Sequence, residues 1–352
     1  MRAMVLKEFL ELRRDKRTMA MIIALPVLLL VIFGYAASFN VDRLNSEVYG
    51  PGARRVADQL RAPFHVGTVD ASAGATDARD RLRAGSADVV VVTGASGHAT
   101  AYVNGANLFA AQTAVAAAGR SHGTLTPEVL FNPDLKTSWV MVPGLVGMIL
   151  AFIGTIVTAI GLVRERQSGT LEQLAVMPFR PADVIAGKIA PYFVLAAFDM
   201  VLVTVIGCLL FGVPFAGNVA VFALGAALFL FVVLGLGVLI STVSRSQGQA
   251  MQLALMVMLP QILLSGLIFP LGSMAAGVRW IGYLLPLTWF NKITNGVMLR
   301  DAPLWSLALP LAVLAGMAVL VFTAAVLRFR RDLAPAMPPV PAAVRTTEPV
   351  TP

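Results

Sequence analysis

Few side chains in this sequence have the types and spacing that catalysis or metal binding requires. The 352 residues include three histidines, His65, His98 and His122, and one cysteine, Cys208. No HxH or HxxxH pattern joins the histidines, so we expect them to be solvated or locally hydrogen-bonded rather than bound to a metal. Cys208 has no partner for an internal disulfide and is expected to act as a small apolar side chain.

The sequence also lacks a phosphate-binding loop. That loop has the form GxxxxGK[ST], whereas the Gly187-Lys188 pair here is followed by Ile189. No cluster of carboxylates with a histidine suggests acid–base catalysis. We therefore expect no catalytic residue, no metal and no cofactor in this chain, and we do not expect it to be an enzyme.

Asp199 is the one charged residue inside a long apolar stretch. It lies about ten residues into a predicted membrane span, or roughly 15 Å along the helix axis. An ionisable group at that depth is costly and is a functional candidate. Four roles are open for Asp199: contact with a cationic substrate, pairing across a dimer, protonation in place, or a hydrogen bond with Thr204.

The composition indicates an α-helical polytopic membrane protein. The chain is 57% hydrophobic and only 13% charged, and its mean hydropathy is +0.79. Soluble domains carry about 25% charged residues. Uncharged apolar runs predict six transmembrane helices, at about 19–40, 139–163, 188–211, 219–243, 249–269 and 304–327.

Lys and Arg near the span ends predict the orientation. Residues 1–18 carry six of them and the loop 164–188 carries four, whereas residues 42–138 carry nine basic and nine acidic residues. Both termini are then cytoplasmic, and the net charge of +8 reflects topology rather than nucleic-acid binding. A signal peptide is the alternative for the first apolar run, but that run is too long and starts too late, so an uncleaved span is expected.

The predicted organisation follows from these features. It comprises a cytoplasmic amphipathic helix (1–18), a first span (19–41), an extracytoplasmic segment (42–138), a second span (139–163), a cytoplasmic loop (164–188), the third to sixth spans (189–334) and a disordered Pro-rich tail (335–352).

The segment 42–138 has the pattern of a small α/β domain. Strands are predicted at 64–70, 87–93, 99–104 and 127–132, and helices at 75–86 and 107–120. The alternation suggests a sheet with helices on one face.

The cytoplasmic loop, VRERQSGTLEQLAVMPFRPADVIAGKIAPY, predicts a short helix beneath the membrane. Thr170 and Gln173 have capping-box spacing, and Pro178 ends the helix. The predicted helix has an apolar stripe of Leu171, Leu174 and Ala175, which must be buried against another surface. The residues alone favour the membrane surface and a protein partner equally.

The same loop closely resembles that of type-2 ABC transporter permeases, in the multidrug-efflux branch with a large external domain after the first span. Four further stretches are similar to that branch: FNPDLKTSWVMVPGLVGMIL, LISTVSRSQGQAMQLALMVMLPQILLSGLIFP, YLLPLTWFNKITNGVMLR and RFRRDLA. The resemblance covers about residues 1–334. Compared with the family, the segment after the first span is compressed around Gly50-Pro51-Gly52, which predicts that the sheet lacks part of one strand.

The resemblance implies the membrane subunit of an ATP-driven exporter in a bacterial plasma (inner) membrane. A separate ATPase subunit would bind ATP and Mg, and two ATPase chains would join two permease chains, as a homodimer or heterodimer, among membrane lipids. The residues implied to couple to the ATPase are Glu165, Gly169, Thr170, Leu171, Glu172 and Pro178. Residues 1–18 resemble an elbow helix, for which membrane anchoring and ATPase contact are both open.

The segment 260–300 is apolar but broken by proline and glycine, and the resemblance implies re-entrant helices near an external exit. Leu267, Phe269 and Pro270 are candidates for an apolar gate, with lipid-facing or packing roles as the alternative. Trp280, Tyr283 and Trp289 suit the outer membrane interface better than substrate stacking.

We expect the substrate to be hydrophobic or amphipathic, drug-like or lipid-like. Two other classes stay open, a secondary transporter that works without ATP and a membrane-anchored sensor or assembly factor. The first predicts internal repeats or an array of intramembrane charges, which the sequence lacks. Six spans and the cytoplasmic loop exceed what the second needs.

Overall fold

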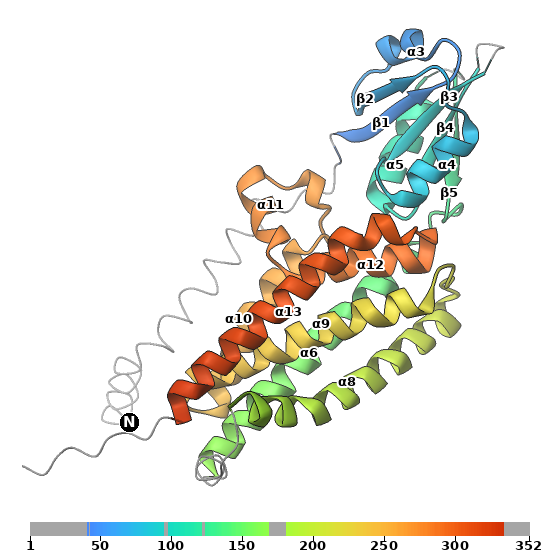
Figure 1. Ribbon diagram of the computed structural model, residues 1–352. Helices are drawn as coiled ribbons and strands as arrows, with labels where there is room; N and C mark the ends of the chain where they lie inside the picture. Colours follow the sequence, from blue (N-terminus) through green and yellow to red (C-terminus); the bar gives the residue numbers. More distant parts are fainter. Residues whose placement is uncertain (1–40, 42, 95–97, 122–123, 169–180, 334–352) are drawn as a thin grey trace, which may run out of the picture.

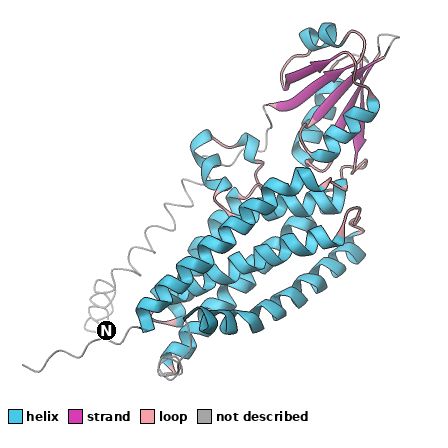
Figure 2. Ribbon diagram, viewed as in Figure 1, coloured by secondary structure: helices cyan, strands magenta, loops and turns pink. Residues whose placement is uncertain are grey.

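The computed structural model describes residues 41, 43–94, 98–121, 124–168 and 181–333. They form a bundle of helices with an α/β domain at one end (Figure 1). Figure 2 shows that the described strands all lie in the α/β domain. The predicted elbow helix 1–18, all of the first span 19–41 except Val41, and the tail 335–352 lie outside the described residues.

The α/β domain is built on one five-stranded sheet of order β2-β1-β3-β4-β5. Its strands are β1 (Leu44–Tyr49), β2 (Phe64–Asp70), β3 (Val89–Thr93), β4 (Ala99–Asn104) and β5 (Leu125–Leu130). The β3–β4 pair is antiparallel, and the other three pairs are parallel. The predictions for β2 and β4 are confirmed, whereas β5 begins and ends two residues earlier than predicted.

Helices cover both faces of this sheet, so the prediction of helices on one face is wrong. Helices α3 (Ala53–Gln59) and α5 (Leu108–Gly119) share a core with Val89 and Val91, whereas α4 (Ala75–Ala84) packs on the face that carries Val90. The run of valines in β3 is apolar on both faces, as expected for a central strand covered on each side.

Strand β1 was not among the predicted strands, and it lies in the segment before Gly50 that the sequence suggested was compressed. That the sheet lacks part of one strand compared with the family stays a prediction. Strand β1, which lies between β2 and β3, carries Glu47, whose polar character hides the strand pattern. Glu47 is only 6% exposed and is bound by the hydroxyl of Tyr49 and the guanidinium of Arg81 on α4. A buried carboxylate is tolerated there because both partners donate to it.

The stability of the full chain is expected to depend on pH through this cluster. Burial raises the pKa of the Glu47 carboxyl, but hydrogen bonds from Arg81 and Tyr49 outweigh it, so the pKa lies below its ordinary value of 4.5. Burial and the bond to Glu47 raise the pKa of Tyr49 to about 12. The stabilisation that ionised Glu47 gives the folded state is therefore lost as pH falls below 4.5, the ordinary pKa of the carboxyl. The stabilisation that the neutral Tyr49 hydroxyl gives is lost as pH rises from 10 towards 12.

Thermal unfolding of the wild type, Glu47→Gln and Tyr49→Phe, each measured across pH, tests this expectation. In a plot of the thermal midpoint against pH, the fall at acid pH should become shallower in Glu47→Gln. The fall at alkaline pH should become shallower in Tyr49→Phe. If both falls keep the wild-type slope in both variants, the pH dependence belongs to other groups.

The bundle contains four described helices that are long and apolar enough to cross a membrane. These are α6 (Thr137–Gln167), α9 (Val219–Val243), the Ala190–Phe211 part of α8 (Pro181–Phe211), and the Leu304–Arg328 part of α13 (Leu304–Leu333). They coincide with four of the six predicted spans, and the 219–243 bounds agree at both ends. Helix α10 (Gln247–Leu264) occupies the place of the predicted fifth span but is not among these four, and the first predicted span lies outside the described residues except for Val41.

A broken segment returns the chain from α10 to α13. It contains the 3-10 turn η1 (Leu271–Ser273), α11 (Ala276–Tyr283) and α12 (Pro286–Arg300). Helix α12 packs among α6, α9 and α13, where the fully buried ring of Phe290 stacks on Phe229 with 4.3 Å between ring centroids. Within the predicted segment 260–300, α12 is therefore an internal packing element of the bundle, whereas α11 buries only Gly282 and η1 buries no residue.

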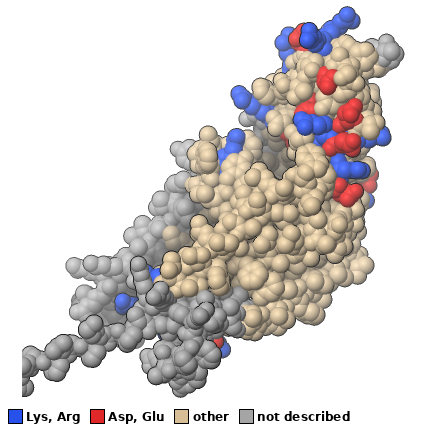
Figure 3. Space-filling model, viewed as in Figure 1, with Lys and Arg blue, Asp and Glu red and all other residues tan. Residues whose placement is uncertain are grey.

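Charged side chains are segregated between the two parts. Figure 3 shows Lys, Arg, Asp and Glu gathered over the α/β domain, while the helices present an uncharged surface on the same face. Large apolar side chains such as Phe198 and Leu209 on α8 and Leu320 on α13 are exposed on the bundle. This distribution matches a bundle surrounded by lipid and a domain surrounded by water.

Candidate translocation and junction sites

The predicted coupling loop leaves the bundle at the end of α6. Glu165 lies in the last turn of α6 and is partly buried, and the hydroxyl of Ser168 donates to its backbone carbonyl at 3.0 Å. The other predicted coupling residues, Gly169, Thr170, Leu171, Glu172 and Pro178, lie outside the described residues.

Arg166 fastens this end of α6 to the neighbouring turn, a role that sequence reasoning missed. Its guanidinium donates to the backbone carbonyls of Ser241 at 3.1 Å and Ser244 at 3.5 Å, at the end of α9. A cation suits the carbonyl end of a helix, where the partial charge is negative. The side-chain amide of Gln247 donates to Oε1 of Gln167 at 3.3 Å. The start of the loop is therefore bonded to the α9–α10 turn.

Asp199 lines a mostly apolar cavity of about 270 Å³ between α6, α8 and α9, here called the membrane pocket. Its Oδ2 atom and the Oγ1 atom of Thr158, which also lines the pocket, are buried without a hydrogen-bond partner. Thr204 Oγ1 likewise has no partner in the structure, so the hydrogen bond with Thr204, one of the four roles left open for Asp199, is not formed. Two polar groups from facing helices thus point to one small apolar space.

The three gate candidates do not form a single constriction. Leu267 is 7% exposed and packs against Gly144 of α6, where an added Cβ atom would collide with the Cδ1 atom of Leu267. Leu267 and Pro270 line a cavity beneath the α/β domain. Phe269 is buried instead in a small core with Leu264 and Met274, which is the packing role that the sequence left open.

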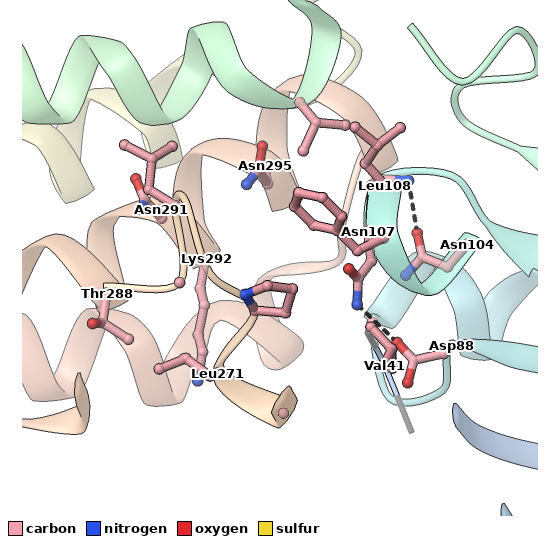
Figure 4. A pocket seen from close by; sticks show the side chains of 18 of the residues that line it. Val41, Asp88, Asn104, Asn107, Leu108, Leu271, Thr288, Asn291, Lys292 and Asn295 are labelled. Atoms are coloured by element: carbon pink, nitrogen blue, oxygen red, sulfur yellow. Dashed lines mark hydrogen bonds between the residues drawn. The ribbon is translucent and has the colours of Figure 1, made fainter. Parts of the chain in front are cut away.

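That cavity, here called the junction pocket, has a volume of about 310 Å³ and is shared between the α/β domain and the bundle. Figure 4 shows Asn291, Lys292 and Asn295 of α12 on one side of the space and Asp88 and Asn107 of the α/β domain on the other. The amide of Asn107 donates to the Asp88 carboxylate at 3.1 Å, and burial raises the pKa of that carboxyl despite this bond.

Arg300, the last residue of α12, also lines the junction pocket and reaches into the α/β domain. It donates to the backbone carbonyl of Arg83 at 3.4 Å. Its guanidinium lies directly over Gly85, whose φ of +72° favours glycine and whose missing side chain leaves the room.

Sequence reasoning missed the polar residues of the junction pocket. They come from segments far apart in the sequence, and only the packing of α12 under the α/β domain brings them together. The available signal was the polar stretch NKITN, residues 291–295, inside an otherwise apolar segment.

Apolar helices of spanning length, with an α/β domain at one end that carries the charged residues, define a multi-pass membrane protein. Residues 16–327 match the family model for ABC-2 family transporter proteins, and the chain belongs to this family.

Three curated relatives from Escherichia coli K12 are similar over different lengths. The probable multidrug ABC transporter permease YbhR is 35% identical over 52% of this chain and 51% of its own length, so the match spans about half of that relative. The probable multidrug ABC transporter permease YbhS is 26% identical over 85% of this chain and 88% of its length. The inner membrane transport permease YhhJ is 33% identical over 60% of this chain and 56% of its length.

Proposed function

We propose that this chain is the permease subunit of an ATP-driven exporter that moves a hydrophobic or amphipathic compound out of the cytoplasm. ATP and Mg would be bound by a separate ATPase subunit, in an assembly of two permease and two ATPase chains within the lipid of a bacterial inner membrane. Family membership and the permease names of the relatives support this proposal.

The observation that carries the proposal is the length and position of α6. One unbroken helix of 31 residues, roughly 45 Å long, joins the start of the predicted coupling loop to both pockets. Glu165 lies at one end, Thr158 lines the membrane pocket, and Met141 lines the junction pocket. A push on the loop would therefore reach both pockets through a single stiff element and shift the balance between inward-facing and outward-facing states.

The arrangement of the two parts supports the proposed orientation. The C-terminal end of α6 and the α/β domain lie at opposite ends of the bundle (Figure 1). The basic residues of the 164–188 loop favour the cytoplasm for that end. The α/β domain is then extracytoplasmic, and both termini are cytoplasmic.

Copurification tests the coupling role. Leu171→Ala and Glu172→Ala are each expected to lose the ATPase subunit from the purified complex, because they remove parts of the proposed contact. Glu128→Ala is the matched control, since Glu128 is a carboxylate on the α/β domain at the other end of the bundle. An ATPase retained by both loop variants, or a cysteine at position 172 labelled from outside intact cells, would refute the proposal.

For Asp199, we propose contact with a cationic part of the substrate in the membrane pocket. The unpartnered Oδ2 atom and the apolar walls support this assignment. Asp199→Asn keeps the shape of the side chain and removes its charge, so it is expected to weaken export of cationic compounds while sparing neutral ones. Equal export rates by the variant and the wild type for a panel of cationic compounds would remove this role.

For Leu267 and Pro270, we propose that they form part of the exit, as the apolar wall of the junction pocket. Leu267→Ala is expected to increase leakage of a small dye through the assembled transporter without ATP. Unchanged leakage would leave Leu267 with a packing role.

A further inference from the structure

The junction pocket contains several buried polar atoms that no group in the structure satisfies. Asn291 is 6% exposed, and neither its Oδ1 nor its Nδ2 atom has a hydrogen-bond partner. Oδ1 of Asn295, one turn further along α12, and Oγ of Ser265, at the end of α10, are also buried without a partner. All three residues line the junction pocket.

Such groups are costly in a folded protein. Burying an amide or hydroxyl without a hydrogen bond is unfavourable, and most buried polar atoms in proteins are paired. Both Asn291 and Asn295 lie on the pocket face of α12, because residues four apart share a helix face. A ligand in the pocket would satisfy the polar atoms of both residues.

The charge balance of the pocket favours an anion. Arg43, Lys292 and Arg300 line it, and among the described residues Asp88 supplies the only carboxylate of the lining. Asp88 already accepts bonds from the backbone of Asn45 at 3.0 Å and from the Asn107 amide.

The two cations of α12 have no acidic partner within the part of the chain that the structure describes. The Lys292 amine lies 4.4 Å from the ring centre of Trp289 and 5.1 Å from that of Tyr283. Arg300 bonds to a backbone carbonyl rather than to a carboxylate. Both positive charges are therefore available to a bound anion.

The lining of the pocket combines an apolar stretch with polar groups. Leu267, Pro270 and Leu271, in the segment after α10, form an apolar wall, whereas α12 and the α/β domain contribute polar side chains. The pocket also lies where the uncharged surface of the bundle meets the charged surface of the domain (Figure 3). An amphipathic molecule would place its polar group at this level and its chain towards the apolar wall.

We infer that the junction pocket binds the phosphate or carboxylate headgroup of an anionic amphiphile, with Lys292 and Arg300 supplying charge and Asn291 supplying hydrogen bonds. The site is distinct from the membrane pocket at Asp199, which is acidic. Binding there requires neither ATP nor the ATPase, so this inference and the proposed function are tested separately.

Equilibrium binding of radiolabelled dodecyl phosphate to the purified full chain, in a neutral maltoside detergent, tests the site. The wild type should bind about one molecule per chain. Lys292→Met should weaken binding on the order of tenfold or more, because a charge-assisted bond is lost. Lys136→Met is the matched control, because Lys136 also lies over a tryptophan, Trp139, but outside the pocket, and it should bind as the wild type does.

Asn291→Leu separates binding from simple packing. This substitution removes the unpartnered amide at similar volume, so it should raise the thermal midpoint of the ligand-free protein and also weaken binding of dodecyl phosphate. If the Asn291→Leu protein does not accumulate, Lys292→Arg is measured in its place. This variant keeps the positive charge and should therefore still bind dodecyl phosphate. Wild-type affinity in Lys292→Met, or displacement of the probe by dodecyltrimethylammonium as effective as by unlabelled dodecyl phosphate, would overturn the inference.

Extraction of lipids from the purified proteins identifies the natural source of the headgroup. An anionic phospholipid that copurifies with the wild type and not with Lys292→Met would identify the occupant as a bilayer lipid. Dodecyl phosphate binding without any copurified phospholipid would point instead to an amphiphile that reaches the pocket by another route. Both results support the site.

Discussion

Phe290→Ala is expected to lower the free energy of unfolding by about 3–5 kcal/mol, the range for removing a buried aromatic ring. Phe290 is fully buried where α6, α9 and α12 meet, and its ring stacks on Phe229 at an interplanar angle of 8°. A side chain at Gly147 of α6 would collide with it, with a Cβ only 2.6 Å from its Cδ1 atom. The space left by alanine is enclosed by protein, so lipid cannot fill it as it would fill a gap on the outer surface.

Phe198→Ala is the matched control for this substitution. Phe198 is 67% exposed on α8, so its removal deletes the same atoms without opening an internal cavity. Thermal or detergent-induced unfolding of the two purified variants gives the comparison. Equal destabilisation of the two variants would mean that the contact between α12 and the bundle contributes little to stability.

Gly237→Val is expected to disrupt both stability and transport, because α9 approaches the backbone of α6 closely at Gly237. A Cβ atom there would lie 2.8 Å from the backbone oxygen of Thr155 and 2.8 Å from Cβ of Thr158. Small residues allow such close approach between membrane helices. Overpacking typically costs about 1–3 kcal/mol, and a shift of α6 would also deform the membrane pocket that Thr158 lines.

Gly316→Val controls for the lower helix propensity of valine. Gly316 lies in α13, and a Cβ atom built there meets nothing within 4 Å. Thermal unfolding and substrate uptake by inverted vesicles should be impaired in the Gly237 variant and close to wild type in the Gly316 variant. Similar losses in both would attribute the effect to valine in a helix rather than to the α6–α9 contact.

Much of the helical architecture could be predicted from sequence because the membrane imposes length and polarity on each span. The uncharged run at 219–243 ends at polar residues on both sides, and α9 has the same bounds. Strand β1 could not be predicted because Glu47 is buried only through its bonds to Arg81 and Tyr49, which belong to the folded domain. Local pattern carries no information about such a partner.

The candidate sites were predicted less completely. Asp199 was found because a charge in an apolar run is conspicuous, but Thr158 beside it resembles any other small residue of a span. Asn291 and Lys292 can be recognised as site residues only in the fold, where α12 packs beneath the α/β domain. The predicted coupling residues from Gly169 to Pro178 stay predictions, since they lie outside the described residues.

The contact between the Arg300 guanidinium and Gly85 limits how freely the α/β domain can be exchanged between members of the family. The contact joins the last turn of α12 to the α4–β3 turn, and it needs both a long cation and a residue without a side chain. A transplanted domain with a bulkier residue at the position of Gly85 would meet the guanidinium and tilt away from the helices. Chimeras should therefore carry α12 and the α/β domain from the same parent.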